Sequence, residues 1–304
     1  MKRTIRIGTR ESQLAVWQAT EVKRLLDLNG HQTELVYIRS EGDIDLQTPL
    51  YEMGVQGVFT RSLDIALVNE QIDIAVHSMK DVPTMLASGI TQAAVLKRAS
   101  HKDLIVYQHD DRFLDDLYGQ AVIATSSIRR KAQWLNRYPN HSIENLRGNV
   151  NTRLQKLADS KWQGAIFAAA GLERIGLRPA DSLELNWMLP APAQGAIMIV
   201  CRERDIFCQE ATICLNDVPT ALCTKMERDF LRELLGGCST PISALAVCEG
   251  EAIKFEGNIV SPDGKMKAEV KKEIQPGQVG EAGKLLAQEI LTCGGQQITN
   301  DLSR

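Results

Sequence analysis

The residues best suited to chemistry lie in a short stretch, Gln71 to Thr84, where an apolar run leads to a lysine next to an aspartate. Ile72 to Val76 is the apolar, β-branched part, typical of a buried parallel strand, and Pro83 ends it. Ligands of open α/β sheets bind beyond the carboxyl ends of strands, so we expect Lys80 and Asp81 in a cleft. There the lysine would hold an anion and the aspartate would stabilise a developing cation. The alternative is an ordinary ion pair on a surface loop.

Basic residues also follow other predicted strands, at or just after the point where a helix begins. Helix N-termini offer unpaired N–H groups and a partial positive charge, and arginine adds a fork that fits a carboxylate or a phosphate. Each of these residues by itself is more often a solvated surface group. Together, in an acidic chain, they indicate a substrate with several negative charges. We expect all of them to face one rim: Arg10, Lys80, Arg129, Arg130, Arg147, Arg153 and Arg174.

The bulk composition is that of an ordinary globular protein. The chain has 304 residues and 44% hydrophobic content, which is enough for two or three domains. Its net charge of -3 argues against a general nucleic-acid binder. Apolar runs are too short to span a bilayer, and the first residues lead into a strand, not into a signal peptide. We therefore expect a cytoplasmic protein that binds neither nucleic acid nor a membrane.

Seven cysteines occur, and none forms a Cys-x-x-Cys pair. An odd number of cysteines without an export signal favours thiols over a disulfide framework or a zinc site. The sequence therefore predicts no metal site, and one thiol remains a candidate for a special role.

The elements that position the Lys80–Asp81 pair begin with a βαβ pattern. Ile5 to Gly8 is a predicted strand, Ser12 is a good N-cap for a helix that stops at Asn29 and Gly30, and residues 34–38 form the next strand. This order predicts a parallel sheet. Residues 41–59 contain several breakers and are either a lid over the cleft or a plain surface loop.

The same pattern recurs after an extended linker strand near residues 92–100. Predicted strands at residues 102–107, 121–124, 143–146 and 164–169 alternate with helices that begin near Ile128 and Val150. The apolar strand Ile197 to Cys201 follows a second linker and is expected to return to the first domain. The second lobe is then an insertion on a double hinge, the arrangement of two-lobed anion-binding proteins such as periplasmic binding proteins.

The remaining residues predict a small α+β domain. A charged amphipathic helix from Thr220 to Leu235 precedes three strands of an antiparallel sheet, and Val279 to Thr292 closes as a helix. The expected domains are residues 1–97 with 196–215, residues 98–195, and residues 216–304. The predicted fold class is therefore two α/β lobes plus an α+β domain with a three-stranded antiparallel sheet.

Five motifs, in this order and register, resemble the porphobilinogen deaminase (hydroxymethylbilane synthase) family. They are His77-Ser78-Met79-Lys80-Asp81-Val82-Pro83, Thr125-Ser126-Ser127-Ile128-Arg129-Arg130, Leu146-Arg147-Gly148-Asn149-Val150 with Thr152-Arg153, Ala169-Ala170-Gly171-Leu172, and Gly236-Gly237-Cys238. The resemblance implies a transferase that joins four porphobilinogen molecules, releases ammonia at each step and frees linear hydroxymethylbilane. It also implies that Cys238 carries a covalent dipyrromethane primer made from the same substrate.

The resemblance assigns roles residue by residue. Asp81 is implied to be catalytic, because a carboxylate facing the pyrrole N–H stabilises the cation formed when ammonia departs. The implied cofactor-binding residues, besides Cys238, are Gln18, Ser78, Lys80, Thr125, Ser127, Arg129, Arg130, Arg147 and Gly148. The implied substrate-binding residues are Arg10, Ser12, Arg147, Arg153, Gly171 and Arg174. Each pyrrole carries an acetate and a propionate, which agrees with the excess of arginine at strand ends.

The chain departs from the family pattern in the expected lid. The family commonly has basic residues where this chain has Glu41, Glu52 and Gln56. A lid with less positive charge should hold a polyanionic product less tightly, so we expect elongation or product retention to differ.

Two other functions remain open from the residues alone. A non-catalytic receptor for a polyanionic small molecule would also need two lobes and an arginine-lined cleft. A transferase using Cys238 as a turnover nucleophile would need a nearby base. We expect a monomer, since no exposed apolar helix is evident.

Overall fold

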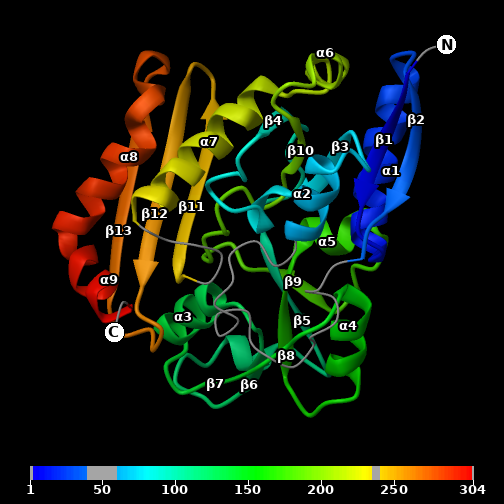
Figure 1. Ribbon diagram of the computed structural model, residues 1–304. Helices are drawn as coiled ribbons and strands as arrows, with labels where there is room; N and C mark the ends of the chain where they lie inside the picture. Colours follow the sequence, from blue (N-terminus) through cyan, green and yellow to red (C-terminus); the bar gives the residue numbers. More distant parts are fainter. Residues whose placement is uncertain (1–2, 40–59, 235–239, 303–304) are drawn as a thin grey trace. The chain divides into compact units, whose positions relative to one another are not determined.

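The computed structural model describes residues 3–39, 60–234 and 240–302 (Figure 1). Contacts between these residues divide them into two compact units. Unit 1 comprises residues 3–39, 60–99 and 195–221, and unit 2 comprises residues 100–194, 222–234 and 240–302. Each unit has its own sheet and its own hydrophobic core.

Unit 1 is built on a five-stranded mixed sheet with the strand order β2-β1-β3-β10-β4. The strands are β1 (Thr4–Thr9), β2 (Gln32–Tyr37), β3 (Ile74–Ser78), β4 (Ile90–Val95) and β10 (Ile197–Arg202). Strands β2, β1 and β3 are parallel, whereas β10 runs antiparallel to both β3 and β4. The expected parallel sheet is therefore mixed, and β4 is an integral strand in the stretch that we interpreted as a linker.

Helices cover both faces of this sheet. They are α1 (Gln13–Leu28), α2 (Arg61–Val68) and α6 (Ile206–Ile213). Side chains of α1 and α6 pack with Ile74 and Val76 on one face. Helix α2 lies on the other face, where a Cβ on Gly8 would collide with Ile72 and approach Leu63. Glycine at this position in β1 therefore allows α2 to pack closely.

The predicted boundaries of α1 are confirmed by its caps. The Ser12 side chain accepts a hydrogen bond from the backbone N–H of Ala15 at 3.4 Å, as an N-cap does. The helix ends at Asn29, and Gly30 has a φ of +82°, the left-handed conformation that commonly stops a helix.

Unit 2 contains a second five-stranded mixed sheet, with the order β7-β6-β8-β5-β9. The strands are β5 (Asp103–Tyr107), β6 (Val122–Ala124), β7 (Ser142–Glu144), β8 (Gly164–Ala168) and β9 (Ser182–Glu184). Strands β7, β6 and β8 are parallel, and β5 runs antiparallel to β8 and β9.

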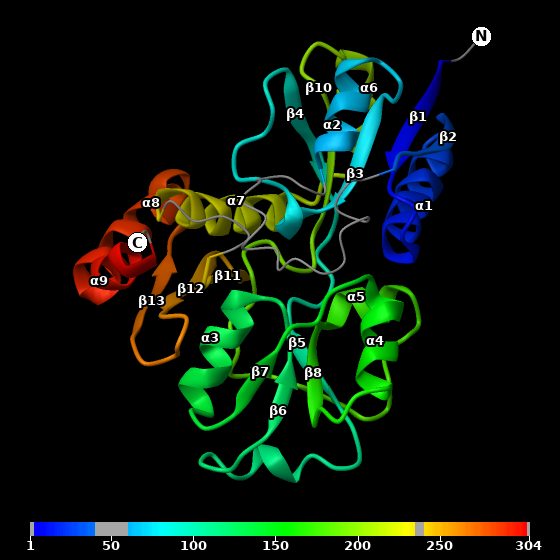
Figure 2. The same ribbon diagram turned by 60° about the horizontal axis from the view of Figure 1, so that its bottom comes forward.

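The helices of this sheet are α3 (Ile128–Arg137), α4 (Val150–Ala158) and α5 (Ala169–Arg174). Helix α3 packs on one face through Trp134, and α4 and α5 pack on the other through Leu157 and Leu172. Figure 2 shows α3 and α4 on either side of the strands.

Unit 2 also contains the C-terminal α+β elements. They are α7 (Val218–Glu233), β11 (Ile242–Glu249), β12 (Ala252–Val260), β13 (Lys267–Ile274), α8 (Val279–Ile290) and α9 (Gln296–Leu302). The three strands form the predicted antiparallel sheet, and Phe230 of α7 and Leu286 of α8 belong to the core cluster that covers it.

The sequence did not predict α9. Gly294, with a φ of +100°, breaks the helix that we expected to end at Thr292, and a new helix follows. The predicted fold class, two α/β sheets plus a small α+β domain, is confirmed.

Candidate functional site

In unit 1 the predicted catalytic residue Asp81 and its neighbour Lys80 lie on a single 3-10 turn, Met79–Asp81, directly after β3. Two features hold the turn in place. The Met79 side chain is buried, and the Met79 N–H donates to the Ala196 carbonyl at 3.0 Å. Lys80 and Asp81 are half-buried. Parallel strands β1 and β3 are neighbours, so their carboxyl ends bring Arg10 and Lys80 to the same edge of the sheet.

Gln18 ties α1 to this edge. Its side chain is buried, and its Nε2 donates to the Ser78 Oγ at 2.8 Å. The Ser12 hydroxyl caps α1 by accepting a hydrogen bond, so part of the role of Ser12 is structural. Unit 1 thus gathers Arg10, Ser12, Gln18, Ser78, Lys80 and Asp81 around the ends of two adjacent strands.

His77 is a buried residue of this edge that the sequence analysis did not place in the site. Burial, and then the positive charge of Arg10, lower the pKa of His77 to about 4. Its Nε2 has no hydrogen-bond partner among the described residues. The imidazole is therefore neutral at pH 7 and adds no positive charge beneath Lys80. The available signal that His77 faces inward was its position directly after the apolar residues of the predicted strand.

In unit 2 the carboxyl ends of three parallel strands meet at one edge. Thr125 follows β6, Arg147 follows β7, and Gly171 lies in the helix after β8. The first two ends are joined directly, because the Ser126 Oγ donates to the Leu146 carbonyl at 2.7 Å. Ser127 caps α3 by accepting from the Arg130 N–H at 3.4 Å. This geometry is the one that the repeated strand-to-helix pattern predicted.

The loop after β7 depends on a glycine. Gly148 has a φ of +114°, and a Cβ there would lie 2.8 Å from the Thr152 Cγ2. The Gly148 carbonyl accepts a hydrogen bond from the Arg153 Nε at 2.7 Å. Arg147 is buried, and its carbonyl accepts from the Lys156 Nζ at 3.2 Å. The loop therefore holds two arginines close to the start of α4.

Arg174 is the last of the predicted cations at this edge and ends the short helix α5. Its side chain is half-buried, and burial lowers its pKa to about 10, with Glu173 opposing the shift. It remains a cation at pH 7, so it keeps the charge that carboxylate binding needs.

Arg129 and Arg130 belong to the seven cations expected to face one rim, and in the structure both lie beside a buried carboxylate. Both are buried, and each donates to a carboxylate oxygen of Asp103 at 2.7 Å. They also bind backbone carbonyls: Arg129 that of Leu189 at 2.6 Å and Arg130 that of Ile166 at 2.9 Å. Burial lowers the pKa of Arg129, opposed by the charge of Asp103. A buried guanidinium needs a carboxylate beside it, and Asp103 supplies one to both arginines.

The sequence analysis did not identify Asp103 as a residue of the site. It is fully buried at the start of β5, opposite Ala168 at the carboxyl end of β8, because those strands are antiparallel. Its Oδ1 also accepts from the Gln194 Nε2 at 2.9 Å. The available signal was a single acidic residue opening an apolar strand. Asp103 thus lies at the edge of unit 2 that carries Thr125 and Arg147.

Two family models match the chain. The model described as "Porphobilinogen deaminase, dipyromethane cofactor binding domain" matches residues 5–210, and "Porphobilinogen deaminase, C-terminal domain" matches residues 221–292. A porphobilinogen deaminase of Syntrophomonas wolfei is 38% identical over 300 residues, which is 97% of this chain and 98% of that protein. The chain belongs to the porphobilinogen deaminase family. The predicted resemblance is confirmed, and the non-catalytic receptor is not favoured.

Solved structures with low sequence identity align with part of this porphobilinogen deaminase family member. The Bordetella pertussis BvgS periplasmic VFT2 domain is 12% identical, with a TM-score of 0.43, over 69% of this chain and 85% of that one. The methionine binding protein MetQ is 16% identical, with a TM-score of 0.43, over 70% and 89%. Likenesses of this size carry no functional argument.

The family description names a dipyrromethane cofactor, and each edge, taken by itself, offers groups that could bind it. A dipyrromethane carries acetate and propionate groups, and the edges supply the matching donors: lysine, arginines, hydroxyls and the backbone N–H groups that open α3 and α4. The described residues contain no group of three or more His, Cys, Asp or Glu that could hold a metal.

Several predicted residues lie outside the described part of the chain. Cys238 belongs to residues 235–239, and Glu41, Glu52 and Gln56 belong to residues 40–59. Their assignments in this family member stay predictions.

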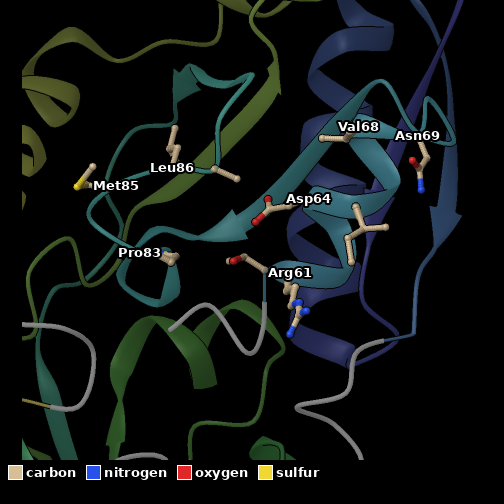
Figure 3. Close-up of a pocket in the computed structure, with 10 residues that line it drawn as sticks. Arg61, Asp64, Val68, Asn69, Pro83, Met85 and Leu86 are labelled. Atoms are coloured by element: carbon tan, nitrogen blue, oxygen red, sulfur yellow. The ribbon is translucent and has the colours of Figure 1, made fainter. Parts of the chain in front are cut away.

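A pocket of about 450 Å³ opens in unit 1 between α2 and residues 83–87 (Figure 3). Burial raises the pKa of Asp64 on its wall, opposed by a hydrogen bond with Thr60. None of the residues that we predicted for the site lines this pocket. Within the described residues, no helix is long and apolar enough to cross a membrane.

Proposed function

We propose that this chain joins four porphobilinogen molecules head to tail, with release of ammonia, and frees hydroxymethylbilane, the reaction of tetrapyrrole biosynthesis catalysed by hydroxymethylbilane synthase. The observation that carries the proposal is the meeting of three strand ends in unit 2, with Thr125, Arg147 and Gly171 at one edge. Such an edge binds carboxylates, and unit 1 adds one lysine and one carboxylate on a fixed turn.

The cofactor would be a dipyrromethane joined to the Cys238 sulfur. When bound, it supplies the free pyrrole position to which each substrate molecule is joined. By the family resemblance we assign its carboxylates to the following residues: Gln18, Ser78, Lys80, Thr125, Ser127, Arg129, Arg130, Arg147 and Gly148. Arg129 and Arg130 each have five N–H donors, so the bonds to Asp103 and to backbone carbonyls leave donors for a ligand.

Substrate carboxylates would bind Arg10, Ser12, Arg147, Arg153, Gly171 and Arg174. Asp81 would accept the pyrrole N–H of the substrate and stabilise the positive charge that appears as ammonia leaves. The neutral His77 behind the Met79–Asp81 turn does not oppose that charge. The turn keeps the carboxylate in place, because Met79 is held by both burial and a backbone hydrogen bond.

The finer assignments belong to the same proposal. The domains would be residues 1–97 with 196–215, residues 98–195, and residues 216–304. The enzyme would act as a cytoplasmic monomer on a small-molecule substrate.

The test compares two aspartates of unit 1. Asp81→Asn should lower the rate of ammonia release and tetrapyrrole formation from porphobilinogen by about 10²–10³-fold per cofactor-loaded molecule. Asp64→Asn, in the pocket of Figure 3, should leave the rate within about twofold. Equal rates in the two variants would overturn the role of Asp81, and no tetrapyrrole from the native protein would overturn the proposed function.

A further inference from the structure

Two cysteines of the C-terminal elements lie in contact. Cys223 is in α7 and Cys248 is near the end of β11, and their sulfur atoms are 3.5 Å apart. Both side chains are thiols. The separation is that of a weak S–H···S hydrogen bond, and a shift of one or two side-chain torsions shortens it to a covalent bond. Neither residue is among those assigned to the proposed reaction.

The surroundings hold the two backbones in register. Glu227, one turn after Cys223 on α7, is fully buried. Its Oε1 accepts the Ala246 N–H at 2.7 Å, and its Oε2 accepts the Ala193 N–H at 2.6 Å. Ala246 is two residues before Cys248 on β11. The Glu227 hydrogen bond to Ala246 therefore joins α7 to β11 close to the two sulfur atoms. Because the sulfur atoms are already in contact, a bond between them needs little backbone movement.

The two thiols also differ in access. Cys248 is exposed, whereas Cys223 is 5% exposed and belongs to the core beneath α7. By contrast, Cys201 and Cys208 of unit 1 are both buried, and burial raises the pKa of the Cys201 thiol to about 11. An oxidant in solution reaches Cys248 first, and Cys223 lies within reach of it as the second sulfur.

We infer that Cys223 and Cys248 form a dithiol that a peroxide converts to a disulfide between α7 and β11. The Cys248 thiol loses its proton, and the thiolate takes one oxygen from hydrogen peroxide to give a sulfenic acid. The hydroxide that is displaced takes up the proton that the thiol lost, so one water is released. The Cys223 sulfur then attacks the Cys248 sulfur and expels a second water. The protein loses two electrons and two protons, and the peroxide is reduced to two waters.

This bond would close the chain segment that joins α7 to β11. The two cysteines are 25 residues apart, and Cys238 lies between them in the sequence. A crosslink over such a loop restricts the unfolded chain and stabilises the folded domain. The inference does not depend on the proposed reaction, because the pair exists whether or not Cys238 carries a cofactor.

The experiment uses the full-length protein as purified, treated with one equivalent of hydrogen peroxide and read by intact mass under denaturing, thiol-blocking conditions. We expect a loss of two hydrogen atoms that dithiothreitol reverses, and a rise of about 5–10 °C in the thermal midpoint of the oxidised form. Addition of oxygen atoms without loss of hydrogen would overturn the inference.

Four single variants locate the bond. Cys223→Ser and Cys248→Ser should each abolish both the mass loss and the thermal shift. The matched controls Cys214→Ser and Cys293→Ser, at two other exposed cysteines, should keep both. A mass loss that survives in either of the first two variants, or that disappears in a control, would overturn the assignment.

Discussion

Each unit contains a buried aspartate surrounded by arginines, but the two clusters lie at opposite ends of their sheets. In unit 1, Asp73 precedes β3 and binds Arg3, Arg6 and Arg202 at 2.9 to 3.2 Å. In unit 2, Asp103 opens β5 and binds Arg129 and Arg130. Because β5 is antiparallel to β8, the start of β5 lies at the carboxyl edge of the parallel strands.

Both clusters pair arginines with a buried aspartate, and they differ in which end of the parallel strands they occupy. The Asp73 cluster lies at the amino end of β3, at the other end of the strand from the Met79–Asp81 turn. Although burial raises it, hydrogen bonds from Arg6 and Arg3 hold the pKa of Asp73 below its usual range. This cluster stabilises unit 1, whereas we propose that the Asp103 cluster also orients arginines for cofactor binding.

Of the substitutions that test this comparison, Asp103→Asn should have the largest effect on stability. It leaves two buried guanidinium groups without their carboxylate, so we expect unfolding to become easier by about 3–5 kcal/mol. We also expect a smaller fraction of purified protein to carry the cofactor, because Arg129 and Arg130 lose their orientation. Urea denaturation gives the first quantity and intact mass the second.

Asp73→Asn is the matched control within the same prediction. Arg202 keeps Asp205 at 2.9 Å, so we expect a smaller loss of about 2–3 kcal/mol. The cofactor-bearing fraction should stay unchanged. If Asp73→Asn lowered that fraction as much as Asp103→Asn, the distinction between the two clusters would be wrong.

The buried histidines predict a smaller effect, on how the stability of the protein depends on pH. The folded pKa of His77 is about 4, below the unfolded value of 6.5, so between these values the unfolded chain binds a proton that the folded chain does not. Stability is therefore lost as the pH falls below 6.5, by about 2 kcal/mol between pH 7 and pH 5. His77→Gln should remove this part of the slope in urea denaturation at several pH values.

Part of the slope should remain in that variant. Burial also lowers the pKa of His141 in unit 2, opposed by Asp116. An unchanged slope in His77→Gln would show that His77 does not resist protonation in the folded protein.

The sequence was sufficient to predict the elements whose local signals are strong. The Ser12 and Ser127 caps, the β3 strand and the three C-terminal strands follow from residue type and spacing, and the structure contains them. The strand-to-helix repeats also predicted that Thr125 and Arg147 lie at one edge.

What the sequence could not give depends on pairing between distant strands. The antiparallel placement of β5 puts Asp103 beside Arg129, 26 residues later, and no local pattern encodes that contact. β4 was interpreted as a linker because its partner, β10, is about 100 residues away in the sequence. Helix α9 was missed because we expected the last helix to end at Thr292, whereas a new helix follows the break at Gly294.

The central claim is that a dipyrromethane joined to the Cys238 sulfur primes the reaction, and intact mass of the purified chain tests it most directly. We predict that the native protein and Cys248→Ser both exceed the sequence mass by one dipyrromethane, and that Cys238→Ser has the bare mass. A native protein at the bare sequence mass, or an excess that persists in Cys238→Ser, would contradict the account.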